Sequence, residues 1–220
     1  LLHNYTAQQP PFVRNSILTN VGSIRSKGIE LYLNAAIIQQ MDLTWSMDFT
    51  ANATSNEITS LSNDVYTLSW LEFGGLPSPG NLGNAIRLEE GSSVGNFYGK
   101  RFAGFTDDGG WLFYKADGSA VPPSEIDDED LTTLGNGVPK YMLSWSNNFN
   151  YKNFDLSLFF RGKFGFEILN TKELYFGNKT WLPNNLLKSA ITTHADLNDN
   201  PQYSDYYLEK GDFVKLDNVT

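Results

Sequence analysis

Several separate runs of this chain show a strict two-residue alternation of apolar and polar side chains, and this feature constrains the fold most. Every odd position from Leu43 to Ala51 is apolar, and every even position from Thr44 to Asn52 is polar. Successive side chains of a β-strand point to opposite faces, so the pattern predicts a strand with one wholly apolar face. Residues 29–35 alternate in the same way, and a short connection near 36–42 joins the two runs into a predicted antiparallel hairpin.

A second hairpin is predicted over residues 141–164. Residues 141–151 alternate with one interruption, Asn147, and 154–164 form the return strand after a turn at Lys152 and Asn153. A last run, 213–220, is strand-like, but its pattern does not assign its faces. The chain is therefore predicted to be all-β, with antiparallel strands.

The connections between these runs are very unequal. Those near 36–42 and 152–153 are short, whereas 53–140 and 166–211 are far longer than the connections usual in compact domains. Short turns on one side and long loops on the other are typical of transmembrane β-barrels of outer membranes, whose strands of roughly 9 to 11 residues cross the bilayer. No run of 18 apolar residues occurs, so a transmembrane helix is excluded.

Strand parity limits what the 53–140 stretch contains. Both strands that flank it have a short turn at their other end, so an even number of crossings must lie between them. Residues 95–105 do not alternate cleanly, so we predict none and place 53–140 in one extracellular excursion. About five crossings result, and because the smallest barrels need about eight strands, this chain cannot close alone.

A soluble β-sandwich is the alternative, because its strands also alternate. The predicted register keeps Arg161 and Lys163 on the polar face, whereas a one-residue shift would turn them toward lipid at roughly 2 to 4 kcal/mol each. Tyr151 and Phe154 beside a turn fit the aromatic girdle of a bilayer interface. A secreted, carbohydrate-binding sandwich stays open as the second hypothesis.

Composition excludes several other classes of protein. With no cysteine there is neither a disulfide framework nor a Cys-based zinc site. The formal net charge of −9 repels phosphate backbones and argues against nucleic acid as a partner. The 14% aromatic share and 19 glycines fit many short strands joined by turns.

Five short motifs resemble the SusC/RagA family of TonB-linked outer-membrane proteins, and they occur in that family's order. Each motif alone is weakly specific, but five in order, from about residue 20 to the end, are together specific. Asp212 and Asp217 depart from the Ser and Lys that are commoner in the last motif. The motifs are Asn20, Gly22, Lys27, Gly28 and Glu30; Phe97, Tyr98, Gly99, Gly104 and Phe105; Asp130, Leu131, Gly135, Pro139 and Lys140; residues 151–157; and residues 211–220.

The resemblance implies a Gram-negative outer-membrane barrel of about 22 strands around an N-terminal plug. It further implies energy supplied by TonB, a SusD-like surface lipoprotein as lid, and import of oligosaccharides or peptides. Residues 1–220 are then expected to be a fragment of one barrel domain, from which the plug and the early strands are missing. The chain begins without Met or a signal peptide and stops inside an alternating run, which fits a fragment.

No catalytic, cofactor or metal site is expected, and the chain is predicted not to be an enzyme. Asp127 to Asp130 are adjacent acids expected in a solvated loop, without the converging pair of a glycoside hydrolase. Residues 107–110 are expected to form a turn, and 196–200 an Asx-rich turn rather than a calcium loop. His3 and His194 lack the partners of a transition-metal site.

Aromatic residues in the long loops are candidate contacts for a ligand or for the lid, because their faces stack on sugar rings and bury readily at interfaces. The alternative is that they form the loops' own hydrophobic clusters. Arg87, Glu89 and Glu90 are expected to be solvated loop charges. The aromatic candidates are Trp70, Trp111, Tyr175 and Trp181, with Phe176 beside them.

Overall fold

The computed structural model describes residues 2–6, 16–64, 67–77 and 82–220, and the chain divides into two compact units. We call Ser26–Ser55, Asn136–Leu169 and Glu209–Thr220 the strand unit. The loop unit comprises Leu1–Arg25, Asn56–Gly135 and Asn170–Leu208. Within the described ranges, no helix is long and apolar enough to span a membrane.

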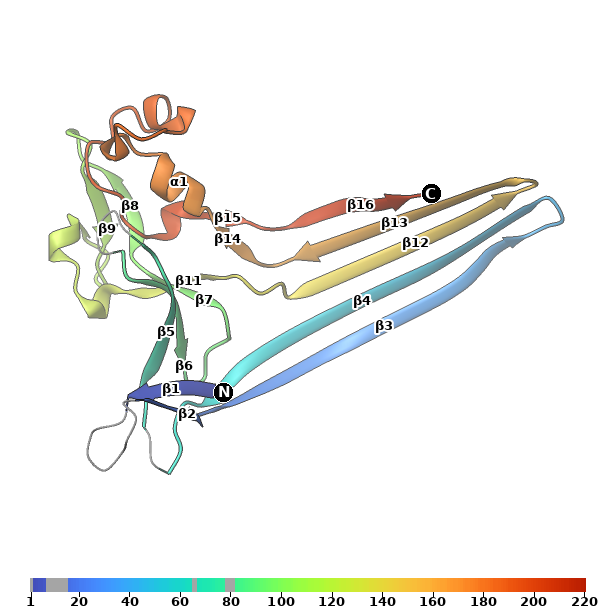
Figure 1. Cartoon of the computed structure of the whole chain (residues 1–220), viewed down its shortest axis with the longest axis horizontal. Helices are drawn as coiled ribbons and strands as arrows, with labels where there is room; N and C mark the ends of the chain where they lie inside the picture. Colours follow the sequence, from blue (N-terminus) through green and yellow to red (C-terminus); the bar gives the residue numbers. More distant parts are fainter. Residues whose placement is uncertain (1, 7–15, 65–66, 78–81) are drawn as a thin grey trace. The chain divides into compact units, whose positions relative to one another are not determined.

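A five-stranded antiparallel sheet, in the order β16-β13-β12-β4-β3, makes up the strand unit (Figure 1). β4 pairs directly with β12, so no crossing lies between them, as predicted from strand parity and from the lack of alternation at 95–105. The five crossings expected from the sequence are present. Their bounds are β3 Ser23–Gln39, β4 Leu43–Ser60, β12 Tyr141–Tyr151, β13 Phe154–Phe164 and β16 Phe213–Val219.

The two short turns lie next to each other at one end of this sheet. Leu43 pairs with Tyr151, and the Lys152 N–H donates to the Asp42 carbonyl over 2.9 Å. Both long excursions leave from the opposite strand ends, which confirms the predicted inequality of the connections. β12 and β13 have the 11 residues expected of a bilayer crossing, but β3 and β4 have 17 and 18, longer than the alternating runs indicated.

A β-bulge explains why the last run resisted assignment. Phe159 pairs with Asn218 and Phe160 with Leu216, so Asp217 is an extra residue in β16. The alternation of β16 therefore changes phase at Asp217. The apolar face of β13 therefore pairs with Val214, Leu216 and Val219 of β16. Because the bulge shifts the alternation by one residue, the sequence pattern alone could not assign the faces of this strand.

The loop unit contains short sheets and short helices. β5, β6, β7 and β11 form one antiparallel sheet, β8, β9 and β10 a second, and β1 and β2 a two-stranded ladder. β14 pairs with β15, and both of these short strands except Leu208 belong to the strand unit. The strand bounds are β1 Leu2–Thr6, β2 Ser16–Asn20, β5 Trp70–Gly75, β6 Asn84–Glu89, β7 Asn96–Gly99, β8 Arg101–Phe105, β9 Trp111–Tyr114, β10 Ala120–Val121, β11 Thr132–Asn136, β14 Glu167–Leu169 and β15 Leu208–Lys210. The helices are η1 Pro123–Glu125, η2 Asp128–Asp130, α1 Thr171–Phe176, η3 Lys179–Trp181, η4 Lys188–Ile191 and η5 Asp205–Tyr207.

Buried apolar side chains of the loop unit gather in two places. Ile58, Leu61, Leu71 and Leu88 form an aliphatic cluster between the end of β4 and the β5–β6 hairpin. Trp111 and Phe113 of β9 are the largest fully buried side chains among the described residues. The strands of 53–140 thus belong to a packed unit of their own and add no strand to the large sheet.

Candidate functional site

Cross-strand rows of the large sheet separate an apolar face from a polar one. Phe49 of β4 lies opposite Trp145 of β12, which lies opposite Phe160 of β13. Two rows nearer the turns on the same face, Trp45 lies opposite Phe149. The Trp45 and Phe149 rings stack at 5.3 Å and those of Trp145 and Phe160 at 5.5 Å. Such aromatic cross-strand pairs stabilise a sheet by about 0.2–1 kcal/mol each.

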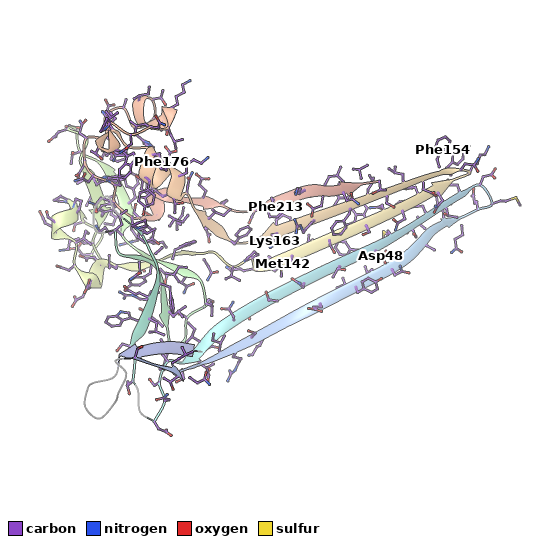
Figure 2. The ribbon with its side chains drawn as sticks, in the orientation of Figure 1. Asp48, Met142, Phe154, Lys163, Phe176 and Phe213 are labelled. Atoms are coloured by element: carbon purple, nitrogen blue, oxygen red, sulfur yellow. The ribbon has the colours of Figure 1, made fainter. Side chains whose placement is uncertain are left out.

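Large side chains on this apolar face are exposed. Ile29 of β3 is 78% exposed and Phe154 of β13, labelled at the turn end in Figure 2, is 77% exposed. Soluble monomers rarely expose apolar side chains contiguously over such a surface, so the face is suited to an apolar surrounding. Other exposed members include Leu31, Leu33, Tyr141, Trp145, Tyr151, Leu156, Val214, Leu216 and Val219.

Asn147, the residue that interrupts the alternation, lies in the middle of the apolar face. β12 runs through it without a register shift, between Met47 and Leu158. Its side chain is only 3% exposed, and the Trp45 indole N–H donates to its amide oxygen over 3.2 Å. The strand predicted over residues 141–151 is therefore continuous, and Asn147 interrupts only the alternation of apolar side chains. The amide is accommodated because a neighbouring side chain supplies a hydrogen bond.

The polar face holds hydrogen-bonded carboxylates. Asp48 of β4 accepts hydrogen bonds from the Tyr32 hydroxyl and the Asn34 amide of β3, both at 2.7 Å. Nearer the long excursions, Met142, Lys163 and Phe213 form one row across β12, β13 and β16 (Figure 2). This face is thus mainly polar, with occasional large apolar members.

The bulge in β16 places a carboxylate between two cations of the polar face. Arg161 and Lys215 are direct cross-strand partners, an arrangement of like charges that destabilises a sheet. Asp217 lies 2.9 Å from the Arg161 guanidinium and 2.7 Å from the Lys215 ammonium. The extra residue therefore offsets the repulsion, and Arg161 and Lys163 lie on the predicted face.

Trp111, one of the aromatic candidates, is buried inside the loop unit. It is 1% exposed, and its indole N–H donates to the Asn200 carbonyl over 2.9 Å. It has no surface for a ligand or a lid, so the alternative of an internal cluster applies to it. The rings of Phe102, Phe105, Phe113, Tyr206 and Tyr207 lie 4.9–5.9 Å from the Trp111 ring.

The other aromatic candidates lie nearer the surface and are not brought together with Trp111. Trp70 on β5 is 51% exposed, with the Arg87 guanidinium 4.8 Å from its ring. Tyr175 is half-buried in α1, and burial raises the pKa of its hydroxyl. Trp181 in η3 contacts Phe176 edge to face at 6.2 Å.

Arg87 is held by specific partners, so the expectation of a solvated charge is wrong. Its side chain is 12% exposed, its guanidinium lies 2.8 Å from Glu72, and it lies 3.8 Å from the Tyr98 ring centre. Glu89 is a second ion-pair partner, at 3.4 Å, and Glu90 accepts a hydrogen bond from the Leu61 N–H over 2.7 Å. Arg87 contacts Glu72 on the neighbouring strand, and Glu90 contacts Leu61 just after the end of β4. These partners are distant in the sequence, so the local sequence did not reveal the contacts.

One of the four adjacent acids is also structural. Asp130 is 7% exposed and accepts hydrogen bonds from the backbone N–H groups of Asp127 and Ala116, which hold the pKa of its carboxyl below the usual value. The solvated-loop expectation is therefore wrong for Asp130, although Asp127, Asp128 and Glu129 are exposed. The predicted turn at 107–110 is present, closed by the Thr106–Gly110 backbone pair at 2.9 Å.

The His194 ring is buried and satisfied by hydrogen bonds. Its Nδ1 lies 2.9 Å from the Gly177 carbonyl, and its Nε2 lies 2.6 Å from the Tyr206 hydroxyl. Because a carbonyl only accepts, Nδ1 donates to the Gly177 carbonyl. The side chain of His3 lies outside the described residues. The described part of the chain contains no group of three acids, histidines or cysteines able to hold a metal ion.

The Asx-rich segment 196–200 ties loops together. The Asn178 amide donates to the Asp199 carbonyl over 2.8 Å, and the Asn198 amide donates to the Asp108 carbonyl over 3.0 Å. The segment thus joins the region around η3 to the β8–β9 turn. Its polar groups serve internal structure, in line with the expectation of a turn.

Comparison with known proteins gives relatives of one kind. No family model matches the chain. It is 27% identical to TonB-dependent receptor P3 of Formosa agariphila, over 94% of this chain and 22% of the receptor. It is 25% identical to TonB-dependent receptor SusC of Bacteroides thetaiotaomicron, over 91% of this chain and 20% of that protein. The chain therefore spans about a fifth of the length of these relatives.

Solved structures share the fold. "Structure of the RagAB peptide transporter" matches 94% of this chain and 23% of the solved chain, with a TM-score of 0.69 and 23% identity. The "open-open" state of the RagAB peptide importer matches 100% of this chain and 24% of the solved chain, with a TM-score of 0.70 and 20% identity. These relatives are receptors and transporters by name, in agreement with the prediction that the chain is not an enzyme. Motifs, relatives and fold together support a SusC/RagA-like fragment of an outer-membrane β-barrel.

Proposed function

We propose that this chain supplies wall strands and extracellular loops to a TonB-dependent outer-membrane transporter that imports oligosaccharides or peptides. The observation that carries the proposal is the five-stranded sheet with one exposed apolar face and one polar face. In a bilayer, every backbone group of a spanning strand must be paired, which an antiparallel barrel wall achieves. The apolar face then contacts lipid and the polar face lines the lumen.

The height of the apolar face fits a bilayer. Aromatic side chains mark its two ends, with Tyr151 and Phe154 beside the turn and Tyr141 and Phe164 at the other end of the same strands. The ten steps from Tyr141 to Tyr151 cover roughly 33 Å along the strand. At a tilt of about 40° this becomes roughly 25 Å, the height of the apolar band of outer-membrane barrels.

The remaining parts of the proposed transporter lie outside residues 1–220. Residues 1–220 form part of one barrel domain of about 22 strands, and β3 and β16 at the edges of the sheet pair with strands of the missing part. The plug and the region that engages TonB belong to that missing part. A SusD-like lipoprotein covers the extracellular side, where the loop unit and its surface aromatics Trp70, Tyr175 and Trp181 are available for contact.

Single-cysteine labelling tests the wall directly. Cysteines are placed one at a time from Leu43 to Asn52 in the intact parent protein in its membrane, and lipid-soluble and aqueous thiol reagents are compared. We expect alternation, with Trp45, Met47 and Phe49 reached from lipid and Ser46, Asp48 and Thr50 reached from water. If all positions react only from water or are protected, the soluble carbohydrate-binding sandwich replaces the barrel.

A further inference from the structure

The link that precedes β12 contains a chemically labile pair of residues to which the wall function gives no role. Asn136 ends β11 and is followed directly by Gly137, and no other asparagine of the chain has glycine after it. An asparagine side chain can react with the backbone nitrogen of the next residue, and glycine obstructs this attack least because it has no Cβ. We propose that Asn136 is a site of spontaneous self-modification, at which the side-chain amide is lost and the backbone rearranges to isoaspartate.

A hydrogen bond inside this link prepares the Asn136 side chain for the reaction. The Val138 N–H donates to the Asn136 Oδ1 over 2.7 Å, so the side chain is turned back over the peptide group that follows it. The attacking nitrogen and the carbonyl carbon Cγ are then neighbours within one chain segment, and little entropy is lost when they meet. A donor aimed at Oδ1 also stabilises the negative charge that develops there in the tetrahedral intermediate, as oxyanion-hole donors do.

The reaction needs water and hydroxide and no other reactant. Hydroxide removes the Gly137 N–H proton, the nitrogen forms a bond to the Asn136 Cγ, and the Cγ–Nδ2 bond breaks as ammonia leaves with a proton from water. The product is a cyclic succinimide, and the hydroxide is regenerated. Water then opens the ring at either carbonyl, which gives aspartate or, with a longer main chain, isoaspartate. The net change is the uptake of a water molecule and the loss of an ammonia molecule.

Solvent reaches this link, and its main chain is not held in a sheet after Asn136. Val138 is 37% exposed, Asn136 and Gly137 are half-buried, and residues 137–139 belong to no strand or helix. Pairing within a sheet would fix the main chain in an extended form and resist ring closure. The nitrogen that attacks thus lies on the first residue beyond the end of β11.

Both ends of the link are fixed, so the rearranged backbone has a consequence for the start of β12. The Asn136 N–H donates to the Glu167 carboxylate over 2.8 Å, and the Lys140 N–H donates to the Phe164 carbonyl over 3.0 Å. Isoaspartate adds a methylene group to the main chain between these two points and attaches a new carboxylate beside the N–H that binds Glu167. Because like charges repel, the modified chain holds the contact with Glu167 less firmly.

The test follows deamidation in the intact parent protein, folded in detergent and kept in mildly alkaline buffer at physiological temperature. Rapid digestion at mildly acidic pH and tandem mass spectrometry locate the modified residue, and an isoaspartyl methyltransferase identifies isoaspartate. Asn153 is the internal control, because it is exposed in a turn but is followed by the bulky Phe154. Gly137→Ala adds a Cβ beside the attacking nitrogen. A synthetic peptide with the sequence of residues 132–141 gives the rate of the same pair without the fold.

We expect Asn136 to be modified about ten-fold faster than Asn153, mainly to isoaspartate, and about ten-fold more slowly in the Gly137→Ala variant. Because the Val138 N–H assists, the folded protein should react at least as fast as the peptide. Unchanged melting of the variant shows that it remains folded. The proposal is overturned if Asn136 reacts more slowly in the folded protein than in the peptide, if Asn153 reacts equally fast, or if Gly137→Ala leaves the rate unchanged. None of these results affects the cysteine-labelling pattern that tests the wall.

Discussion

The strand unit and the loop unit place their aromatic side chains in opposite environments. In the strand unit, Trp145 is 40% exposed and Phe154 77%, on the outside of a single sheet. In the loop unit, Trp111 is 1% exposed and Phe113 fully buried, inside a cluster of rings. The loop unit is therefore stabilised by the burial of its own apolar surface, as soluble domains are, whereas the apolar face of the strand unit depends on an apolar solvent.

This difference determines which part of the chain the sequence describes well. Each face of the large sheet meets one environment along its whole length, so its strands alternate cleanly. A strand such as β9, which is short and packed into an irregular cluster, shows no such period. Alternation in the sequence therefore identifies the strands of the large sheet, but it does not identify the short strands of the loop unit.

The largest expected effect is from truncation of the central ring of the loop unit. Trp111→Ala removes a fully buried side chain and lowers the local opening free energy of the loop unit by about 3–5 kcal/mol. Trp145→Ala, in the strand unit, costs no more than about 1.5 kcal/mol because it removes mainly a ring contact. Hydrogen exchange of the parent protein in lipid measures both. If both substitutions lowered the opening free energy equally, the contrast would fail, and the apolar face of the sheet would have to be a buried core.

Arginine placed on the two faces of β4 tests the strand unit alone. Met47→Arg puts a charge near the middle of the apolar face and destabilises the folded protein in phospholipid vesicles by about 2–4 kcal/mol. Ser46→Arg, one residue away on the polar face, changes stability by less than about 1 kcal/mol, since it points to water and lies near Asp48. Urea titration of vesicle-folded protein provides the comparison. Similar costs for both variants would contradict the assignment of the faces.

A pair of glycines sharpens the account of the loop unit. Gly109 has φ +80° and a Cβ there would overlap the Asp196 carbonyl, whereas Gly118 has φ +88° with nothing near it. Gly118→Ala carries only backbone strain, about 1 kcal/mol, and Gly109→Ala adds the steric clash, for a total of about 2–3 kcal/mol. The two melting temperatures, measured side by side, isolate the contact. If the two variants lose equal stability, the β8–β9 turn does not pack on residue 196.

The smallest expected effect is a pH dependence confined to the loop unit. Backbone N–H groups of Asp127 and Ala116 lower the pKa of folded Asp130, so its contribution to stability is present above the unfolded pKa of about 3.9. It is lost as the pH falls through the lower folded value. The protection factors of loop-unit amides, which are corrected for the intrinsic pH dependence of exchange, should fall between pH 5 and 3 in the wild type, by an amount that corresponds to one hydrogen-bonded carboxylate. The Asp130→Asn variant should lose this component, and a full retention of it would assign the acid sensitivity to another group.

Local sequence identified the wall but not the internal contacts of the candidate residues. Phe97, Tyr98 and Gly99 were recognised as a motif, yet their contact with Tyr203 joins positions about a hundred residues apart. Arg87 and Glu72 face each other only because β5 pairs with β6. Among the aromatic candidates, composition could not separate buried Trp111 from half-exposed Trp70, since both follow polar or glycine-rich stretches.

The sequence by itself determined the five wall strands, the two faces of the first four, the short turns on one side and the resemblance to SusC/RagA proteins. These properties are local, because side-chain period and turn residues are set within a few positions of one another. Only the tertiary structure decided that Asn147 fits the apolar face, that Asp217 is a bulge between two cations, and that Glu167 binds the Asn136 N–H. Each of these features depends on which distant strand lies alongside. The free energy of an interaction between two distant segments cannot be read from either segment alone.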